Sequence, residues 1–531
     1  MEKHAFKLRW GVVAIPLVIF GFVITMGFVN KDMFISVLWT YFEWLMVNFG
    51  WAIDLGSLAF VIFTISLIFH PLGKVRLGGP NAKPQFNTWH WWAMSLCAGM
   101  AMGIVMWPGP EALGHALTPP RGMYLESGSP QAIIFAMRTV FLHWTFTPYA
   151  IYVACGVICA YAIYNLKRPV AVSSALYPLL GERSTGTVAT IVDGLTLFAI
   201  TGGVAGSLGM GMLQMGSGLD LVFGIKPGPV VWVAVAVAIV VGYTTSSITG
   251  IQKGIKWLSD KNAWLFCGLL AFAFVFGPTS FILNLVTQSF GSYVTHFFEA
   301  MTFTDPFPGT DLWPQWWDMF WFTDWLSFAP IVGLFMVRLS YGRTIKEFIV
   351  VNMILPATFC VLWFGVFGAL TIHGQFVQGV DLNAVMQEKG MEVVMLQVFD
   401  LLPLAAIIRP IMLFTIFISF VTLADSMTST VSLLSITGFV KTGEEEAPVP
   451  LKLFWGILMG ATSIIFVFNG GLDGIKVVKT MAGVPILFLE VAMVLGFLIY
   501  HFKKKPTYIE KNAGDSKPVY SDLVKGMEMH E

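Results

Sequence analysis

The sequence is poor in charge. Of its 531 residues only 12% are charged, while 56% are hydrophobic, and a soluble domain carries roughly 25% charged residues. Lys and Arg together number 31, as do Asp and Glu, so the formal net charge is +0 and no bulk attraction to nucleic acid is expected. Together with a mean hydropathy of +0.74, this balance excludes an ordinary soluble domain and indicates a polytopic helical membrane protein.

The sequence also lacks the arrangements that enzymes use. The nine histidines form no close HxxH or HxxxH pair, and neither a nucleophile elbow nor a phosphate-binding loop is present. The five cysteines lie in apolar segments without a CxxC pair, which is typical of small buried hydrophobes. We therefore expect no enzymatic activity and no organic cofactor.

What the chain has instead is a series of long apolar segments. About 20 such residues cross a bilayer, and twelve segments qualify, near 10–28, 51–70, 88–107, 137–163, 187–213, 229–249, 263–287, 317–337, 347–373, 406–437, 453–469 and 482–501. Lys and Arg are concentrated in alternate connections and at both ends of the chain. By the positive-inside rule this predicts a multi-pass protein of the cell (inner) membrane with both termini in the cytoplasm.

Two of these segments are interrupted by flexible or polar residues. They are the third, "CAGMAMGIVMWPGPE" (97–111), and the eighth, "FWFTDWLSFAP" (320–330). Because they lie five spans apart, they enter the membrane from opposite sides, which is typical of an inverted-repeat transporter. The predicted organisation is a cytoplasmic tail (1–8), two added helices (9–85), a first five-helix repeat (86–287), an amphipathic connection at the interface (288–316), a second repeat (317–501) and a cytoplasmic tail (502–531).

The stretch from Gly99 to Gly103 lies in the middle of the third span. Glycine weakens a helix interior and lets a ligand or another backbone approach closely. Unwound amides there would accept an anionic group, and freed carbonyls would hold a cation. The alternative is close helix–helix packing through small residues.

Aromatic residues gather in two spans. Trp144, Tyr149 and Tyr152 surround Pro148, and Trp321, Asp324, Trp325 and Phe328 are spaced i, i+3, i+4 and i+7 on one helical face. Aromatic faces attract quaternary ammonium groups, although such a stripe also suits a core or a lipid-facing surface. Asp324 is costly inside a bilayer, so it predicts ligand or ion handling unless it has a basic partner or lies nearer the interface.

The tenth span carries a polar band, "ISFVTLADSMTSTVS" (418–432). Hydroxyl and carbonyl oxygens suit a hard cation such as Na⁺. Hydrogen bonding between helices is the alternative.

Together these motifs resemble the betaine/choline/carnitine transporters. The similarity is carried by "WTFTPYAIY" (144–152), the run from Gly99 to Glu111, "GIQKGIKWLSDKNA" (250–263), "FAPIVGLFMVRLSYGRTIKEF" (328–348) and "FVTLADS" (420–426). The resemblance implies an all-α LeuT-type fold with twelve transmembrane helices. Its two inverted repeats are spans 3–7 and 8–12, preceded by two helices, and members usually assemble as a homotrimer in the lipid membrane.

The resemblance also implies a substrate site. An aromatic box for a trimethylammonium group carries over to Trp144, Tyr149, Tyr152 and Trp325, with Phe322 and Phe328 where the family often has further tryptophans. Any carboxylate of the substrate would lie near Gly99, Met100, Ala101, Met102 and Gly103. Position 324 is usually tryptophan in the family and is Asp324 here.

Sodium coupling is less well supported by the resemblance. The family's sodium site carries over to Cys97, Met100, Ser419 and Thr422, but Leu423 stands where sodium-coupled members have a hydroxyl. We therefore expect a secondary transporter of glycine betaine, a carnitine-like compound or a related quaternary or methylated ammonium compound. The alternatives are a choline or methylamine transporter that uses Asp324, and a sodium-independent exchanger.

Overall fold

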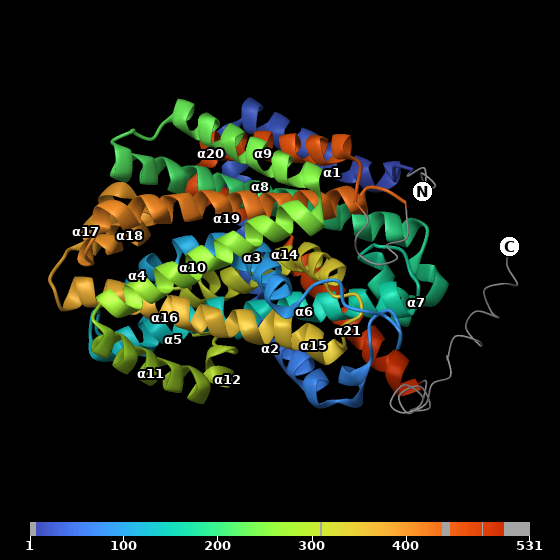
Figure 1. Ribbon diagram of the computed structural model, residues 1–531, viewed down its shortest axis with the longest axis horizontal. Helices are drawn as coiled ribbons and strands as arrows, with labels where there is room; N and C mark the ends of the chain where they lie inside the picture. The colour runs from blue at the N-terminus through green and yellow to red at the C-terminus, as the bar shows by residue number, and fades with distance from the viewer. Residues whose placement is uncertain (1–6, 308–310, 438–445, 481, 504–531) are drawn as a thin grey trace, which may run out of the picture.

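The computed structural model describes residues 7–307, 311–437, 446–480 and 482–503. Its helices run side by side along the long axis of the molecule (Figure 1). The first half contains α1 (Trp10–Val29), α2 (Lys31–Phe69), α3 (Thr88–Met106), α4 (Pro108–Leu117), α5 (Pro130–Trp144), α6 (Phe146–Ala160), α7 (Tyr177–Leu180), α8 (Thr187–Phe223), α9 (Pro229–Thr249) and α10 (Lys256–Phe276).

The second half begins with short helices and continues with long ones. It contains α11 (Thr279–Thr295), α12 (Phe297–Ala300), α13 (Trp313–Trp316), α14 (Asp318–Leu339), α15 (Ile345–Ile349), α16 (Leu355–Phe376), α17 (Leu382–Lys389), α18 (Met391–Gln397), α19 (Ala405–Leu434), α20 (Val449–Thr480) and α21 (Gly483–Lys503). Within the described ranges no strand forms beyond two isolated bridges. The prediction of an all-helical fold is confirmed.

Single helical turns of other types join several of these helices. Five are 3-10 turns, Pro71–Lys74, Arg121–Met123, Ser173–Leu176, Gly181–Ser184 and Val398–Leu401. Three are π-helical, Tyr161–Asn165, Ile251–Ile255 and Val350–Ile354. The π-helical turns extend α6, α10 and α16 without a break, so each of these spans is longer than its α-helical part.

Among the described residues, ten helical segments are long and apolar enough to cross a membrane, and Trp10–Phe22 is a shorter apolar helix. The twelve predicted spans are therefore not all reproduced by length and hydropathy. The third is divided into α3 and α4 at Trp107, where Pro108 begins the second helix. Another difference follows α10, because Gly277 and Pro278 end that helix and α11 starts separately at Thr279.

The helix contacts are symmetric between the two predicted repeats. Helix α14 of the second repeat packs on α6 of the first, and α4 of the first packs on α16 of the second. In the same way α3 contacts α19 and α10, while α14 contacts α8 and α21. Exchanging the repeats therefore preserves the packing, as an inverted repeat requires.

The two spans that were predicted to be interrupted lie at the centre of this packing. The third span is divided, but the interruption predicted at 320–330 is wrong, because α14 runs unbroken from Asp318 to Leu339. Every residue of α14 is buried, and so is nearly all of the segment formed by α5 and α6. By contrast only 22% of the apolar stretch of α9 is buried, which suits a helix that faces lipid. The candidate site is built where α3, α4, α5, α6 and α14 meet.

Candidate functional site

The glycine stretch lies inside α3, which is an unbroken helix from Thr88 to Met106, so the predicted unwinding there is wrong. The stretch receives the aromatic rings of the next span, as the alternative of close packing through small residues expects. A Cβ added to Gly103 would lie 2.0 Å from Cζ3 of Trp144, and one added to Gly99 would lie 3.4 Å from Cε1 of Tyr149. Only glycine at 103 allows the indole to come this close. Met102 is buried, while the side chains of Met100 and Ala101 lie outside the described part of the structure.

Four of the predicted box residues form a continuous series of rings. The centroids of Trp144 and Trp325 are 5.0 Å apart at an interplanar angle of 76°, and those of Tyr152 and Trp325 are 6.2 Å apart at 90°. Tyr149 and Tyr152 are 6.4 Å apart at 87°. Neighbouring rings are thus nearly perpendicular, as adjacent walls of a box are, and all four side chains are buried.

The two predicted phenylalanines are also buried on α14. Phe322 packs against the ring of His143, and Phe328 lies against Gly203 of α8, where a Cβ would be 3.2 Å from its ring. Three rings that were not predicted for the box extend the series. Trp321 stacks on Trp325 with centroids 5.4 Å apart, and Trp144 stacks on Phe364 at 5.1 Å and on Trp107 at 6.1 Å.

Asp324 is completely buried, as the sequence analysis expected for an acid within a span. It lies near the side chain of Tyr152 on α6. Its carboxyl group is thus a neighbour of one wall of the aromatic series.

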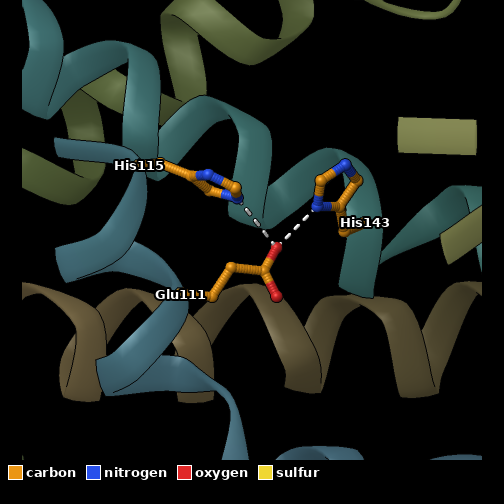
Figure 2. A group of neighbouring side chains, drawn as sticks. All are labelled: Glu111, His115 and His143. Carbon is orange, nitrogen blue, oxygen red and sulfur yellow. Dashed lines mark hydrogen bonds and ion pairs between the residues drawn. The ribbon is translucent and has the colours of Figure 1, made fainter. Parts of the chain in front are cut away.

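A charged cluster that the sequence analysis missed adjoins the box. Oε1 of Glu111 lies 2.5 Å from Nδ1 of His143 and 3.3 Å from Nε2 of His115. Figure 2 shows this carboxylate pointing between the two imidazole rings. On its other side, Nε2 of His143 lies 2.7 Å from Oδ1 of Asp318, and all four residues are buried.

The cluster holds both tryptophans of the box. The indole N–H of Trp144 donates to Oε2 of Glu111 at 2.6 Å, and that of Trp325 donates to the backbone oxygen of His143 at 3.0 Å. Two signals for this cluster were present in the sequence: the i, i+4 spacing of Glu111 and His115, and the occurrence of ionisable residues within predicted spans. The contact with His143 and Asp318 is not encoded by any spacing.

Glu111, His115 and His143 are residue types that can bind a metal, and one ligand atom from each lies within 4.8 Å of the others. However, both ring nitrogens of His143 already face carboxylate oxygens at hydrogen-bond distance. A ring nitrogen that shares a proton with a carboxylate has no lone pair to give a metal. The geometry is therefore that of a hydrogen-bonded ionic cluster.

A neutral polar group lies at the predicted sodium position. The amide of Asn262 on α10 donates to Oγ of Ser419 at 3.1 Å and to Sγ of Cys97 at 3.6 Å. Ser419 and Thr422 donate their own hydroxyl protons to backbone oxygens one turn earlier in α19. The structure brings Cys97 and Ser419 together through Asn262, and Leu423 is buried nearby on the same helix.

Comparison with known proteins agrees with this architecture. Residues 11–506 match the model of the BCCT, betaine/carnitine/choline family transporter. A probable glycine betaine transporter of Desulfitobacterium hafniense is 33% identical over 83% of this chain and 86% of its own. The glycine betaine transporter OpuD of Bacillus subtilis is 31% identical over 98% of both chains. An ectoine/hydroxyectoine transporter of Virgibacillus pantothenticus is 30% identical over 86% of this chain and 89% of its own.

The family match covers almost the whole chain, and the relatives are transporters rather than enzymes. The apolar helices independently require a multi-pass membrane protein. The chain therefore belongs to the betaine/carnitine/choline family of membrane transporters.

Proposed function

We propose that this protein is a secondary transporter of a quaternary ammonium zwitterion of the glycine betaine type. The observation that carries the proposal is the perpendicular arrangement of Trp144, Trp325 and Tyr152 beside the glycine stretch. Each aromatic face attracts a desolvated cation by up to about 2 kcal/mol. We place the substrate's carboxylate near the stretch from Gly99 to Gly103, as the family resemblance implies, next to the rings of Trp144 and Tyr149 that pack on these glycines.

The inverted repeats supply the transport cycle in this proposal. The first span of each repeat, α3–α4 and α13–α14, moves against the remaining helices, so that the box opens to one side of the membrane at a time. We place both termini in the cytoplasm, because the basic connections then lie inside. We also propose the repeat boundaries given above and a homotrimer within the lipid bilayer.

The box is tested by replacing Trp325 with alanine. Losing one cation–π wall should weaken binding of glycine betaine by about tenfold or more, because Trp325 contacts both Trp144 and Tyr152. The measurement is calorimetric binding to the purified protein, followed by uptake into proteoliposomes. Trp257→Ala is the matched control, since this tryptophan is 62% exposed. Equal affinities in the two variants would exclude the box.

A second candidate substrate is a net cation such as choline, and Asp324 favours it. This acid is buried beside Tyr152, so its charge would attract a cation and repel the carboxylate of a zwitterion. Under this alternative, Asp324→Asn weakens choline binding by about fivefold, the effect of roughly 1 kcal/mol of lost attraction. Glycine betaine binding in the same variant should be unchanged or tighter. Parallel titrations of both ligands separate the two substrates.

The coupling mode follows from the neutral group at the predicted sodium position. Because Ser419 and Cys97 already bond with Asn262, we favour transport without sodium over the sodium-coupled mode. Counterflow in proteoliposomes with K⁺ in place of Na⁺ tests this, and uptake that stops without Na⁺ would contradict it.

A further inference from the structure

The proton content of the charged cluster can be counted from its contacts. His143 faces Glu111 through Nδ1 at 2.5 Å and Asp318 through Nε2 at 2.7 Å. An imidazole nitrogen and a carboxylate oxygen can share such a contact only if a proton lies between them. The three groups therefore hold two protons and carry one net negative charge, which leaves room for one more proton.

Among the residues that the structure describes, few other charged groups lie near this cluster. The titratable and charged groups that face it from the elements packed around it are His115 on α4, Arg138 on α5, Asp54 on α2 and, through Arg138, Glu299 on α12. Glu111, His115 and Asp54 are all buried. Since the low dielectric strengthens electrostatic interactions there, a charge that arrives nearby changes the proton affinity of the cluster.

Trp144 connects the cluster to the aromatic box. Its indole N–H donates to Oε2 of Glu111 at 2.6 Å, while its ring contacts Trp325. A hydrogen bond to an ionised carboxylate is stronger than one to a neutral acid, and it increases the electron density of the ring that the cation meets. Protonating Glu111 would reverse both effects, so a proton in the cluster opposes a cation in the box.

We propose that Glu111, His143 and Asp318 form a proton-binding site that releases a proton when a quaternary ammonium group occupies the aromatic box. The inference rests on the proposed function, because the cation must bind in the aromatic box to which Trp144 and Trp325 contribute. Binding is reciprocal, so protons must weaken substrate binding as much as substrate weakens proton binding. The cluster thus makes the transporter sensitive to pH and gives it a route for exchanging a cation against a proton.

The test is calorimetry on the full-length protein with glycine betaine and choline, in buffers that differ in ionisation enthalpy. Across about pH 5 to 8, the heat should reveal net proton release. As the pH is lowered, the affinity for the substrate should fall by up to about tenfold per pH unit if binding displaces one proton. Binding whose heat does not depend on the buffer and whose affinity is independent of pH would overturn the proposal. Because this measurement uses the unmodified protein, it does not depend on the folding of any variant.

Asp318→Asn then assigns the proton to the cluster. The amide keeps the size of the side chain but cannot ionise, so proton release should fall and the pH profile should flatten while ligands still bind. Glu182→Gln is the control, since that carboxylate is exposed and paired with Arg168, and it should behave as the unmodified protein does. Full proton release from Asp318→Asn would overturn the assignment.

Two further outcomes of these experiments can be told apart from the ones above. Binding that is lost on adding a chelator and restored by Zn²⁺ would show that the cluster holds a metal, and would overturn the proton site. If no quaternary ammonium compound binds at all, the proposed function fails and this inference fails with it. Binding without proton release overturns the inference alone.

Discussion

Two buried polar groups connect helices in the interior of the protein, and they differ in charge. On one side, Glu111, His143 and Asp318 form a buried ionic cluster around a single imidazole. On the other side, Asn262 joins Ser419 and Cys97 by hydrogen bonds between neutral groups. Both connect helices of the two predicted repeats, since α5 meets α14 in the first case and α3 and α10 meet α19 in the second.

The difference indicates how each group can respond to ions. A neutral amide and hydroxyl exchange hydrogen-bond partners without any change of charge, and each such bond contributes only about 0.5–1.5 kcal/mol. Buried carboxylates and an imidazole are costly to desolvate, and removing one partner of a buried pair leaves an uncompensated charge. The ionic side is therefore where protons and substrate charge should act, and the neutral side should mainly hold helices together.

Glu111→Ala should have the largest effect. It removes the acceptor of Trp144 and one partner of His143, at an expected cost of about 3–5 kcal/mol in the free energy of unfolding. Thermal unfolding in detergent measures this. Glu111→Gln keeps a hydrogen-bond acceptor for Trp144 and should lose less. Equal stability of the two variants would mean that the buried charge contributes little. The ionic group would then not differ from the neutral group in the way described above.

Asn262→Ala should have a smaller effect on the neutral side. Two hydrogen bonds are lost without a change of charge, which predicts a loss of roughly 1–3 kcal/mol and an unaltered pH profile of substrate binding. Asn284→Ala is the matched control, since that amide is exposed and bonds only within its own helix to Ser280. A pH profile altered as much as that of Asp318→Asn would show that the neutral side also titrates.

Glu446→Gln should have the smallest effect, because Glu446 lies in the connection before α20, outside the membrane spans. Burial raises the pKa of Glu446, but the charges of Arg338 and Lys452 outweigh it and hold the pKa below its usual value. A lowered pKa stabilises the fold above the unfolded value of about 4.3, and the gain disappears as the pH falls through the folded value. Near neutral pH the variant should lose about 1 kcal/mol. The difference from the unmodified protein, followed by thermal unfolding, should vanish in acid; a difference that persists there would contradict the electrostatic account.

Much of the fold was predictable because a membrane imposes simple rules on sequence. Apolar runs and the distribution of basic residues predicted helices close to those observed, such as 229–249 for α9. Helix ends were harder to predict. The segment before residue 51 was taken as a connection, yet α2 begins at Lys31, where the Asn30 side chain caps it by accepting from the Met33 N–H. Such a cap satisfies an otherwise unpaired N–H group of the first turn and so fixes where the helix begins.

Only part of the candidate site could be predicted from the sequence. Trp144, Tyr152 and Trp325 share recognisable motifs, and their rings do meet. Phe328 lies on the same helical face as Trp325 by spacing, yet it packs against Gly203 of α8. Spacing along one helix gives the direction of a side chain and says nothing about which neighbouring helix receives it. For the same reason Trp107 and Phe364 could not be assigned to the box in advance.

The sequence by itself determined that this chain is a helical membrane protein, because hydropathy and periodicity are local properties. It also placed an acid, Asp324, among aromatic residues. Only the tertiary structure decided that Glu111, His143 and Asp318 meet. They come from α4, α5 and α14, and Glu111 and Asp318 stand more than two hundred positions apart in the chain. Three ionisable side chains are tolerated in an apolar interior when packing brings them into contact, and in our proposal that contact links proton binding to the substrate box.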